Sequence, residues 1–463
     1  MKKQKQEKKK QTIIKMSKEL AIVNIHAAGI DIGDTEHYVA VENGDGYEVR
    51  NYNAFTIDLK TIVQWLKSIG INTVAMESTG VYWLQLYLLL EEAGIEVYLV
   101  NAKHVKNVTG RKRDDSDAIW IQKLHRCGLL QKSFQPEYEQ RILRNYVRQR
   151  KNLVTIASDS TRRMQKALEL MNIKVHTVIS DLLGKSGMMI VEAILKGERN
   201  ARILASLCDP RIKASPEEII KSLEGLWSEE YLFMLGQAYD EYKFYQKQIQ
   251  DCDKKIQEQL LKQVAIVKEG DVTDVSQQNT SKRDHAISNP IYKKKAKKNQ
   301  IHFSSVPYLT LLFGVNLCAM PGISEISALE LLAEIGTDMS KWKSVKQFIA
   351  WLNLAPNTKI TGGKMVSSKM MKKKNRAGQT LKMAASTLSR NKGPLGDYYR
   401  RMRGKLGGKG AVLATAHKLA KIIYIMIKEK KEYNPELLNE AQQTYKLIRI
   451  KQLEKQLAHL KAA

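Results

Sequence analysis

The sequence predicts an α/β N-terminal domain, a middle region of α-helical coiled coil, and a mostly α C-terminal domain. Strand-like and helix-like segments alternate over residues 22–130, which is typical of an α/β sheet. Apolar residues then recur every three or four positions along two long segments, and a compact helical pattern begins near Pro307. The 463 residues allow about three domains, and an apolar content of 43% is enough to give each a core.

Two apolar runs and a turn define the first domain, residues 22–130. A β-type run extends from Ala28 to Val41, and Asn43-Gly44-Asp45-Gly46 predicts a hairpin turn between the first two strands. The second run, Thr73–Glu77, leads through a Ser-Thr-Gly turn into a helix expected over Val81–Ala93. The predicted order is strand, hairpin, strand, helix, strand, helix.

Residues 137–264 carry two heptad-like stripes, one from about 138 and one from about 228. Helices of this length predict a coiled coil, either folded on itself or formed between subunits, and a spacer role fits as well as dimerisation. The stripes consist of Leu143, Val147, Val154, Ala157, Met164, Leu168 and Met171, and of Leu235, Ala238, Tyr242, Tyr245, Ile249, Cys252 and Ile256.

The remaining chain is expected to hold a linker, a domain and a tail. Residues 265–305 are polar and predict a flexible linker or insertion. The C-terminal domain, 306–430, contains Met320-Pro321-Gly322-Ile323-Ser324 before a helix expected over Ala328–Ile335. This is a helix-hairpin-helix-like motif, in which backbone amides at a glycine turn can bind phosphate. Residues 431–463 are expected to form a basic helical tail.

Four carboxylates predict a metal-binding catalytic site: Asp31, Glu77, Asp114 and Asp117. Asp31 interrupts an apolar strand, where an unpaired carboxylate is costly. Glu77 closes the second apolar run, at the end of the strand where α/β sheets build their sites. Asp114 and Asp117 are three residues apart, so a helix would place them on one face. Oxygen ligands from three elements suit Mg²⁺ or Mn²⁺, which assist phosphoryl transfer.

Each carboxylate also has an ordinary structural interpretation. Asp31 could cap a turn, Glu77 could favour the start of the next helix, and Asp114 to Asp117 could be an acidic first turn. Taken singly, that interpretation is the stronger one for Glu77 and for the aspartate pair, and it is weak for Asp31. The combination of all four favours the metal site.

The charge of the chain predicts a polyanionic partner. The net charge is +28, from 76 basic and 48 acidic residues. Six of the first ten residues are lysine, a second lysine run lies at 293–298, and no acidic residue occurs from 356 to 396. A disordered solubilising tail explains the first run and could explain the second. It does not explain 356–396, where glycines and apolar residues interleave with the charge.

The cysteines and the hydropathy indicate a cytoplasmic protein. Cys127, Cys208, Cys252 and Cys318 are far apart, which favours neither a zinc site nor a disulfide framework. We expect no apolar stretch approaching the roughly 20 residues of a membrane span, no signal peptide and no membrane partner.

The ordered motifs resemble those of the DEDD transposases of the IS-one-ten (IS110) insertion-sequence family, from about residue 28 to 430. They are Gly-Ile-Asp31, Met-Glu77-Ser-Thr-Gly-Val-Tyr, Asp114-x-x-Asp117-Ala, Pro-Gly-Ile-Ser, and Leu-Ala-Pro with a Gly-Gly loop. The resemblance implies a RuvC-like, RNase-H-like N-terminal domain, a coiled-coil connection and a C-terminal transposase domain. It also implies recombination of double-stranded DNA in the prokaryotic cytoplasm, guided by a structured RNA and carried out by a homo-oligomer, a dimer or tetramer.

The resemblance further implies a serine nucleophile just before a glycine, beyond the Leu-x-Pro motif. In this sequence Thr361 stands at that position, before Gly362. Threonine is a more crowded alcohol and is stiffer at its first side-chain torsion, so attack could be slow, displaced to Ser367 or Ser368, or lost. The basic residues expected to contact nucleic acid around it are Lys359, Lys364, Lys369, Lys372, Lys373, Lys374 and Arg376.

Three functions follow from these observations. The first is a transposase in which the carboxylates hold Mg²⁺ against a phosphate that a hydroxyl attacks, while Lys359 and Lys364 offset the developing charge. The second is a Mg²⁺-dependent, structure-selective DNA nuclease that uses water instead. The third is a non-catalytic nucleic-acid-binding protein, which would leave Asp31 unexplained.

Overall fold

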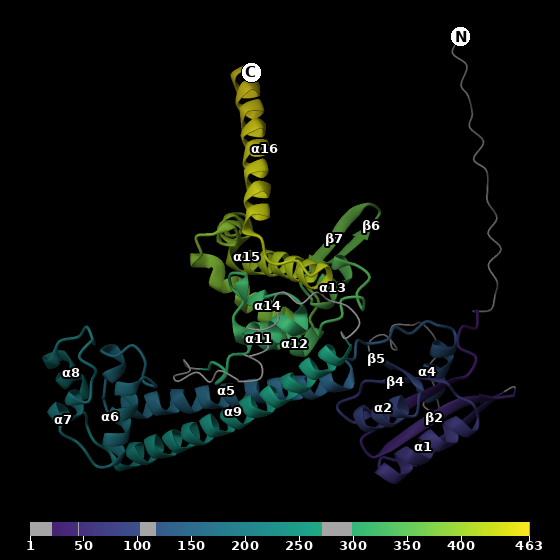
Figure 1. Ribbon diagram of the computed structural model, residues 1–463, viewed down its shortest axis with the longest axis horizontal. Helices are drawn as coiled ribbons and strands as arrows, with labels where there is room; N and C mark the ends of the chain where they lie inside the picture. Colours follow the sequence, from purple (N-terminus) through teal and green to yellow (C-terminus); the bar gives the residue numbers. More distant parts are fainter. Residues whose placement is uncertain (1–20, 45, 102–116, 271–298, 463) are drawn as a thin grey trace. The chain divides into compact units, whose positions relative to one another are not determined.

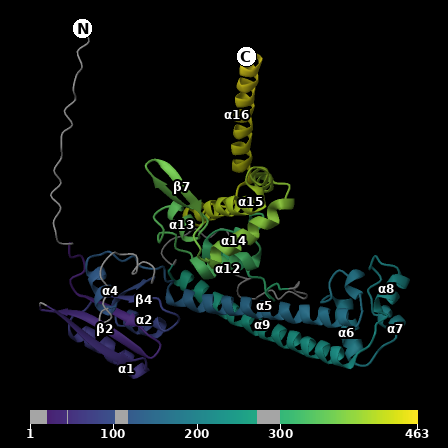
Figure 2. The same cartoon turned by 180° about the vertical axis from the view of Figure 1, so that it is seen from behind.

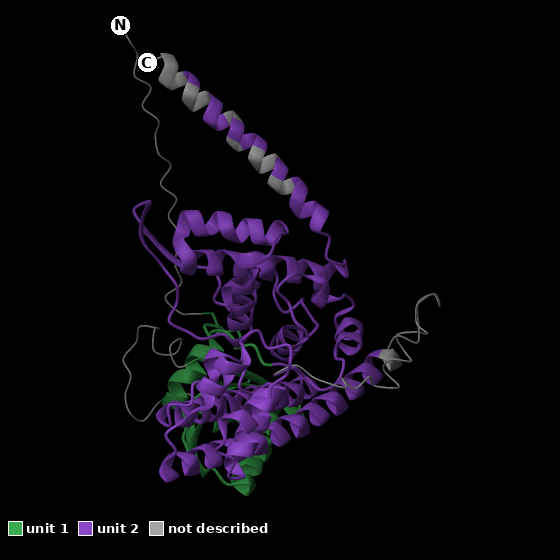
Figure 3. Ribbon diagram, turned by 90° about the vertical axis from the view of Figure 1, so that its left-hand side faces the viewer, with its two compact units in different colours: residues 1–135 green, residues 136–463 purple. Residues whose placement is uncertain are grey.

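The computed structural model describes residues 21–44, 46–101, 117–270 and 299–462. The chain divides into two compact units, residues 1–135 and 136–463 (Figure 3). The lysine runs expected at the N-terminus and at 293–298 lie outside the described residues.

The first unit contains a mixed five-stranded sheet with helices (Figure 1). The strand order is β3-β2-β1-β4-β5, with β1, β2 and β3 antiparallel and β4 and β5 parallel to β1. The elements are β1 (Ala27–Ile32), β2 (Glu36–Asn43), β3 (Gly46–Asn53), α1 (Thr56–Ser68), β4 (Thr73–Glu77), α2 (Trp83–Glu92), β5 (Glu96–Val100) and α4 (Asp117–Arg126).

The β-type run from Ala28 to Val41 is two strands, so the expected single first strand was wrong. The chain turns at Gly33, whose backbone N–H donates to the carbonyl of Glu36 over 2.9 Å. A Cβ on Gly33 would lie 2.6 Å from that same carbonyl oxygen, so the tight turn depends on glycine. The predicted hairpin turn therefore joins the second and third strands, β2 and β3, and its Asp45 lies outside the described residues.

The sheet is covered on both faces. Helices α1 and α2 pack on one face, where Ile30, Val39, Val74 and Met76 belong to the main core. Helix α4 packs on the other face, where Ala75 and Val100 meet apolar side chains of α4. Because side chains alternate along a strand, the residues next to Ile30 and Met76 in sequence point toward α4.

Two long helices dominate the second unit and run side by side (Figure 2). They are α5 (Tyr138–Leu170) and α9 (Glu229–Gly270), as the two apolar stripes predict. Of the two forms of coiled coil considered, the structure shows the one folded on itself, with Leu153 and Ala157 packed on Ile249. The helices that lie between α5 and α9 in the sequence pack around a separate apolar core, at the end of the coiled coil where α5 ends and α9 begins. They are η2 (Val175–Thr177), α6 (Lys185–Leu195), α7 (Ala201–Ser206) and α8 (Pro216–Leu223).

A buried ion pair crosses the α5–α9 seam. Arg150 of α5 and Asp253 of α9 are 5% and 2% exposed, and Nε of Arg150 lies 2.5 Å from Oδ1 of Asp253. The guanidinium also donates to the backbone carbonyls of Asn299 and Gln300, and His302 Nδ1 lies 2.6 Å from Asp253 Oδ2. These extra partners matter because a buried charge is costly unless its polar atoms are satisfied.

The C-terminal part is largely helical and contains one two-stranded antiparallel ribbon among its described residues. Its elements are α11 (Val306–Phe313), η3 (Leu317–Ala319), α12 (Glu325–Ile335), α13 (Val345–Trp351), β6 (Asn357–Thr361), β7 (Lys364–Lys369), α14 (Arg376–Thr387), η4 (Leu388–Arg390), α15 (Pro394–Glu429) and α16 (Pro435–Ala462). The segment around the expected Gly-Gly loop is a ribbon over residues 357–369, because Thr358, Ile360, Thr361 and Val366 favour strands.

Arginines of α5 hold the C-terminal end of α12. Arg144 donates to the carbonyls of Ala333 and Glu334, in the last turn of α12, where carbonyls lack partners within the helix. Nε and Nη2 of Arg148 each donate to one carboxylate oxygen of Glu334 over 2.8 Å. The negative end of the α12 dipole therefore faces two cations, which fixes α12 on the coiled coil.

Two boundaries differ from the expected ones. Helix α9 continues to Gly270, into the segment expected to be a linker, and residues 271–298 lie outside the described residues. Helix α12 begins at Glu325, where Ser324 caps it by accepting from the N–H of Ser327. Gly322, in the turn before it, has a φ of +90°, which explains the glycine.

Helix α15 contains an 18-residue stretch that is long and apolar enough to cross a membrane, although no such stretch was expected. Half of that stretch is buried inside the structure. Leu419, Ile423 and Ile427 are fully buried, and α15 packs on α13 and α14. The stretch is therefore accounted for as a core helix, and α16 follows it as the expected tail helix.

The first prediction concerns His125, which is 1% exposed, with Nε2 2.8 Å from the Thr73 hydroxyl. Burial lowers the pKa of His125 to about 4, and Glu96 opposes this only in part. Below its ordinary pKa of about 6.5 the unfolded chain binds a proton that the folded chain does not. We therefore expect the first unit to lose about 3 kcal/mol of stability as the pH falls from 7 to 4.

The measurement is urea unfolding at each pH, read by a hydrogen-exchange pulse at one fixed pH on peptides from β1 and β4. His125→Gln should make the stability of this unit less dependent on pH. An equal loss of stability in the wild type and in the variant would contradict the assignment.

Candidate functional site

Two of the predicted carboxylates lie at the ends of neighbouring parallel strands. The β1–β4 ladder pairs Gly29 with Ala75 and Ile30 with Met76, so one further step brings Asp31 level with Glu77. Ile30 and Met76 point into the main core, and Asp31 and Glu77 therefore point to the opposite face, toward α4. Both side chains are half-buried, and the Glu77 carboxylate accepts a hydrogen bond from the Thr79 hydroxyl over 3.3 Å.

Helix α4 brings the third carboxylate to the same face. Its first residue is Asp117, whose Oδ1 is buried, and its second is Ala118. A Cβ on Gly29 would lie 2.3 Å from the Ala118 carbonyl oxygen and 2.3 Å from the Gln122 nitrogen. The first turns of α4 thus rest directly on the backbone of β1, two residues before Asp31.

The fourth carboxylate, Asp114, lies outside the described residues. Within residues 21–44, 46–101 and 117–135 of this unit, and in the described part of the rest of the chain, no group of three or more His, Cys, Asp or Glu side chains is gathered closely enough to hold a metal ion. The structure therefore brings Asp31, Glu77 and Asp117 to one face of the sheet without closing them into a ligand cage.

A buried histidine of β2, on the opposite face of the sheet from Asp31, was not predicted from the sequence. His37 of β2 pairs with Ile32 and is 1% exposed, and its Nδ1 has no hydrogen-bond partner within the described residues. Burial lowers the pKa of His37, while the charge of Asp31 acts to raise it. The neutral ring is therefore favoured. His37 stands at an inward position in the alternating pattern of an apolar strand, and that position could have revealed its burial from the sequence.

Tyr38 is the residue of β2 directly paired with Asp31. Its hydroxyl donates to the Glu36 carboxylate over 3.0 Å. This hydrogen bond, with a smaller effect of Asp31, raises the pKa of Tyr38. Asp31 thus adds a negative charge that a cation in this region would offset.

In the second unit, Thr361 ends β6 at the tip of the exposed ribbon. It pairs with Lys364 across a two-residue turn formed by Gly362 and Gly363, with φ of +57° and +75°. Two positive φ values are those of the tight hairpin turn that matches strand twist. A Cβ on either glycine would meet nothing within 4 Å, so this turn is open to an approaching ligand.

The ribbon register separates the three hydroxyls considered as nucleophiles. Lys359 pairs with Ser367, so Ser367 lies on the same face as Thr361, about 7 Å further from the tip. Ser368 pairs with Thr358 and lies on the opposite face. Ser367 is half-buried, whereas Thr361 is exposed. Ser368 is exposed as well, so Thr361 is the exposed hydroxyl that lies at the tip, on the face of Lys359 and Lys364.

The predicted basic residues all lie on the ribbon or just after it, and all are exposed. They are Lys359, Lys364, Lys369, Lys372, Lys373, Lys374 and Arg376. The base of the ribbon is fixed by Asn353, which is 5% exposed and has a φ of +54°. Its amide donates to the carbonyls of Met371 and Lys373 over 3.1 and 2.7 Å, which holds the chain leaving β7 in place.

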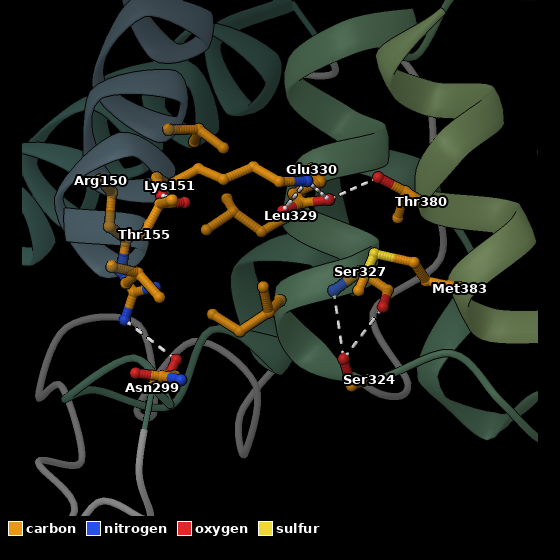
Figure 4. Close-up of a pocket in the computed structure, with 13 residues that line it drawn as sticks. Arg150, Lys151, Thr155, Asn299, Ser324, Ser327, Leu329, Glu330, Thr380 and Met383 are labelled. Atoms are coloured by element: carbon orange, nitrogen blue, oxygen red, sulfur yellow. Dashed lines mark hydrogen bonds and ion pairs between the residues drawn. The ribbon is translucent and has the colours of Figure 1, made fainter. Parts of the chain in front are cut away.

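A cavity of about 310 Å³ lies between α5, α12 and α14 (Figure 4). Figure 4 shows Lys151 of α5 and Thr380 of α14 on either side of Glu330 of α12. Lys151 Nζ lies 2.8 Å from the Glu330 carboxylate, to which the Thr380 hydroxyl also donates. Since these charged groups already satisfy one another, the cavity wall serves to join the helices.

Comparison with known families gives two matches. A model of DEDD transposases named for IS110, described as Transposase, matches residues 28–173. A second model, described as Transposase IS116/IS110/IS902 family, matches residues 315–400. The first match includes Asp31, Glu77 and Asp117, and the second includes Thr361. No curated protein sequence matches the chain.

The second prediction concerns Gly29. We expect Gly29→Ala to destabilise the first unit by about 1–3 kcal/mol, because its Cβ would force α4 off the sheet. The control is Gly46→Ala, whose Cβ would have only the Asn43 carbonyl within 4 Å, at 3.9 Å. Urea unfolding of both variants measures the difference. Equal midpoints for Gly29→Ala and the control would contradict the close approach of α4.

Proposed function

The chain belongs to the IS110 family of transposases, and on that premise we propose that it moves its insertion sequence by metal-assisted phosphoryl transfer with Thr361 as nucleophile. Its activity is DNA transposition, so DNA is its substrate. The observation that carries the proposal is the register of β1 and β4, which aligns Asp31 with Glu77 on the face covered by α4. Asp117 begins α4 on that same face.

We propose that the first unit is an RNase-H-like, RuvC-like catalytic domain. The order β3-β2-β1-β4-β5, with three antiparallel strands followed by two parallel ones, supports this assignment. The carboxylates lie at the carboxyl ends of the parallel strands, where open sheets bind their ligands.

The donor set fits a hard divalent cation, and we propose Mg²⁺ or Mn²⁺. Asp31, Glu77 and Asp117 offer only oxygen atoms, which such cations prefer, and we assign Asp114 as the fourth ligand. The bound cation would neutralise charge on the scissile phosphate. Because the carboxylates are half-buried, water competes less with the cation for their oxygen atoms.

The nucleophile is proposed to be Oγ1 of Thr361, acting on the scissile phosphodiester of the DNA. Oγ1 forms a bond to phosphorus, the bond from phosphorus to the departing DNA oxygen breaks, and the threonine proton ends on that oxygen. Lys364, the cross-strand partner of Thr361, and Lys359 on the same face lie where they can offset the developing negative charge. The bond energy is conserved in a covalent protein–DNA ester.

We further propose that the seven basic residues of the ribbon region bind nucleic acid. Their exposure and the absence of acidic residues from 356 to 396 support this. The turn at Gly322, before α12, is proposed as a helix-hairpin-helix-like contact with a DNA phosphate. The net charge of +28 also suits a structured guide RNA bound together with the DNA.

Self-association as a dimer or tetramer is proposed on a different surface from the α5–α9 seam. That seam is filled within one chain, but Phe233 and Phe244 of α9 are 65% and 57% exposed. Large exposed aromatic side chains on a long helix favour contact with another protein surface.

The third prediction tests the carboxylates. We expect Asp31→Asn and Glu77→Gln each to reduce Mg²⁺-dependent cleavage of DNA by about a thousandfold, since each removes one anionic ligand. DNA affinity should remain, because it depends on the basic surface. The control is Glu92→Gln, an exposed carboxylate at the end of α2. Retained cleavage in both site variants would exclude this metal site.

The fourth prediction separates transposase chemistry from hydrolysis. With a nicked suicide duplex, the wild type and Thr361→Ser should form a covalent protein–DNA adduct that Thr361→Ala cannot form. Denaturing gel electrophoresis measures the adduct. An adduct in Thr361→Ala that disappears with Ser367→Ala would move the role to Ser367. Cleavage without any adduct would favour a nuclease that uses water.

A further inference from the structure

The β6–β7 ribbon has two chemically different faces. The register places Lys359, Thr361 and Lys364 on one face and Ile360 with its partner Met365 on the other. The register shifts between Lys359 and Ile360, which leaves Val366 as the extra residue of a β-bulge next to Met365. One face thus carries cations and the proposed nucleophile, and the other carries apolar side chains.

The apolar face is open to solvent. Ile360, Met365 and Val366 are 65%, 66% and 68% exposed, although they adjoin one another. An isolated two-stranded ribbon is marginally stable in water, and this one places its apolar residues outward. A contiguous exposed apolar group of this kind indicates a binding surface.

The surrounding charge identifies the partner. Lysines lie on the other face of the ribbon and follow it, and no acidic residue occurs anywhere from 356 to 396. A partner that suits both faces must therefore combine anionic groups with flat apolar surfaces. The DNA duplex does so, because its phosphates lie next to stacked bases. Its major groove admits a two-stranded ribbon, and apolar side chains can wedge between base steps.

We propose that Ile360, Met365 and Val366 form a wedge that unstacks the base step beside the phosphate attacked by Thr361. The lysine face meets the backbone of the strand to be cut while the apolar face packs against the exposed bases. The hydrogen bonds from Asn353 to the chain after β7 hold the base of the ribbon in place while the ribbon enters the duplex. This inference rests on the proposed function, because it takes Thr361 as the residue brought to the phosphate.

The test uses the full chain with a nicked DNA duplex from the element's end and RNA transcribed from its flanking sequence. 2-Aminopurine, whose fluorescence rises when it is unstacked, replaces the base beside the cut. The variant Ile360→Thr/Met365→Thr keeps strand-forming residues and every lysine. The matched control is Val49→Thr, at an exposed strand position that is 39% exposed in the first unit.

We expect the wild type, the control and Thr361→Ala to raise the fluorescence, and the double variant not to raise it. The double variant should keep its DNA affinity but form the covalent adduct about tenfold more slowly. A mismatch placed at the step beside the cut should restore the rate, because the duplex is then already unstacked. Circular dichroism checks that the double variant is folded.

A full rise in fluorescence with the double variant would overturn the wedge. The wedge would also be overturned if the double variant no longer self-associated in light scattering but still unstacked the DNA. That result would assign the apolar face to a second copy of the chain. A rise in fluorescence with wild type and Thr361→Ala, but with no adduct in the wild type, would reject Thr361 as nucleophile and leave the wedge standing.

Discussion

The close approach of α4 to β1 at Gly29 is the contact on which the candidate site depends. Asp31 and Glu77 are placed by the sheet, but Asp117 is placed by a helix. Only a residue without a side chain lets the first turns of that helix rest on the strand. The contact is reinforced by Gln122, whose side-chain amide donates to the Ala27 carbonyl over 3.2 Å. Strand register and helix position are thereby fixed together, and carboxylates from separate elements share one face.

In the second unit, a series of polar contacts links the coiled coil to the ribbon. Arg144 and Arg148 hold the end of α12, and Glu330 of α12 is bound by α5 and by α14. Asn375 caps α14 and also donates to the Trp351 carbonyl, and Asn353 holds the chain just before it. Directional contacts of this kind keep an exposed ribbon at a defined position, which apolar packing alone would not do.

Features set by local pattern could be predicted from the sequence, whereas features set by distant contacts could not. The strand positions of Asp31 and Glu77 follow from apolar runs, and the existence of the two long helices follows from their stripes, although α9 continues to Gly270 beyond its predicted end. The Arg150–Asp253 pair could not be predicted, because its residues are 103 positions apart and each resembles a surface charge until both helices are placed. The division of the first β run escaped prediction because one glycine makes the turn.

The ribbon shows the same limit in another way. Gly362 and Gly363 indicate a turn, but the residues around them are exposed and lack the in-out alternation that marks a half-buried strand. Cross-strand pairing was therefore not evident, although it decides which hydroxyl lies beside which lysine. Asn353 gave no signal either, since its backbone conformation and its two acceptors exist only in the folded domain.

The closure of the α5–α9 seam within one chain has a consequence for how the protein accumulates in a cell. If the coiled coil were shared between subunits, this region could fold only after two chains had met. Newly made chains at low concentration would then unfold or be degraded. Here the apolar stripes are satisfied internally, so the folding of this region does not depend on how many copies are present. A single newly made copy can therefore persist in folded form, and its abundance need not rise before it becomes available to nucleic acid.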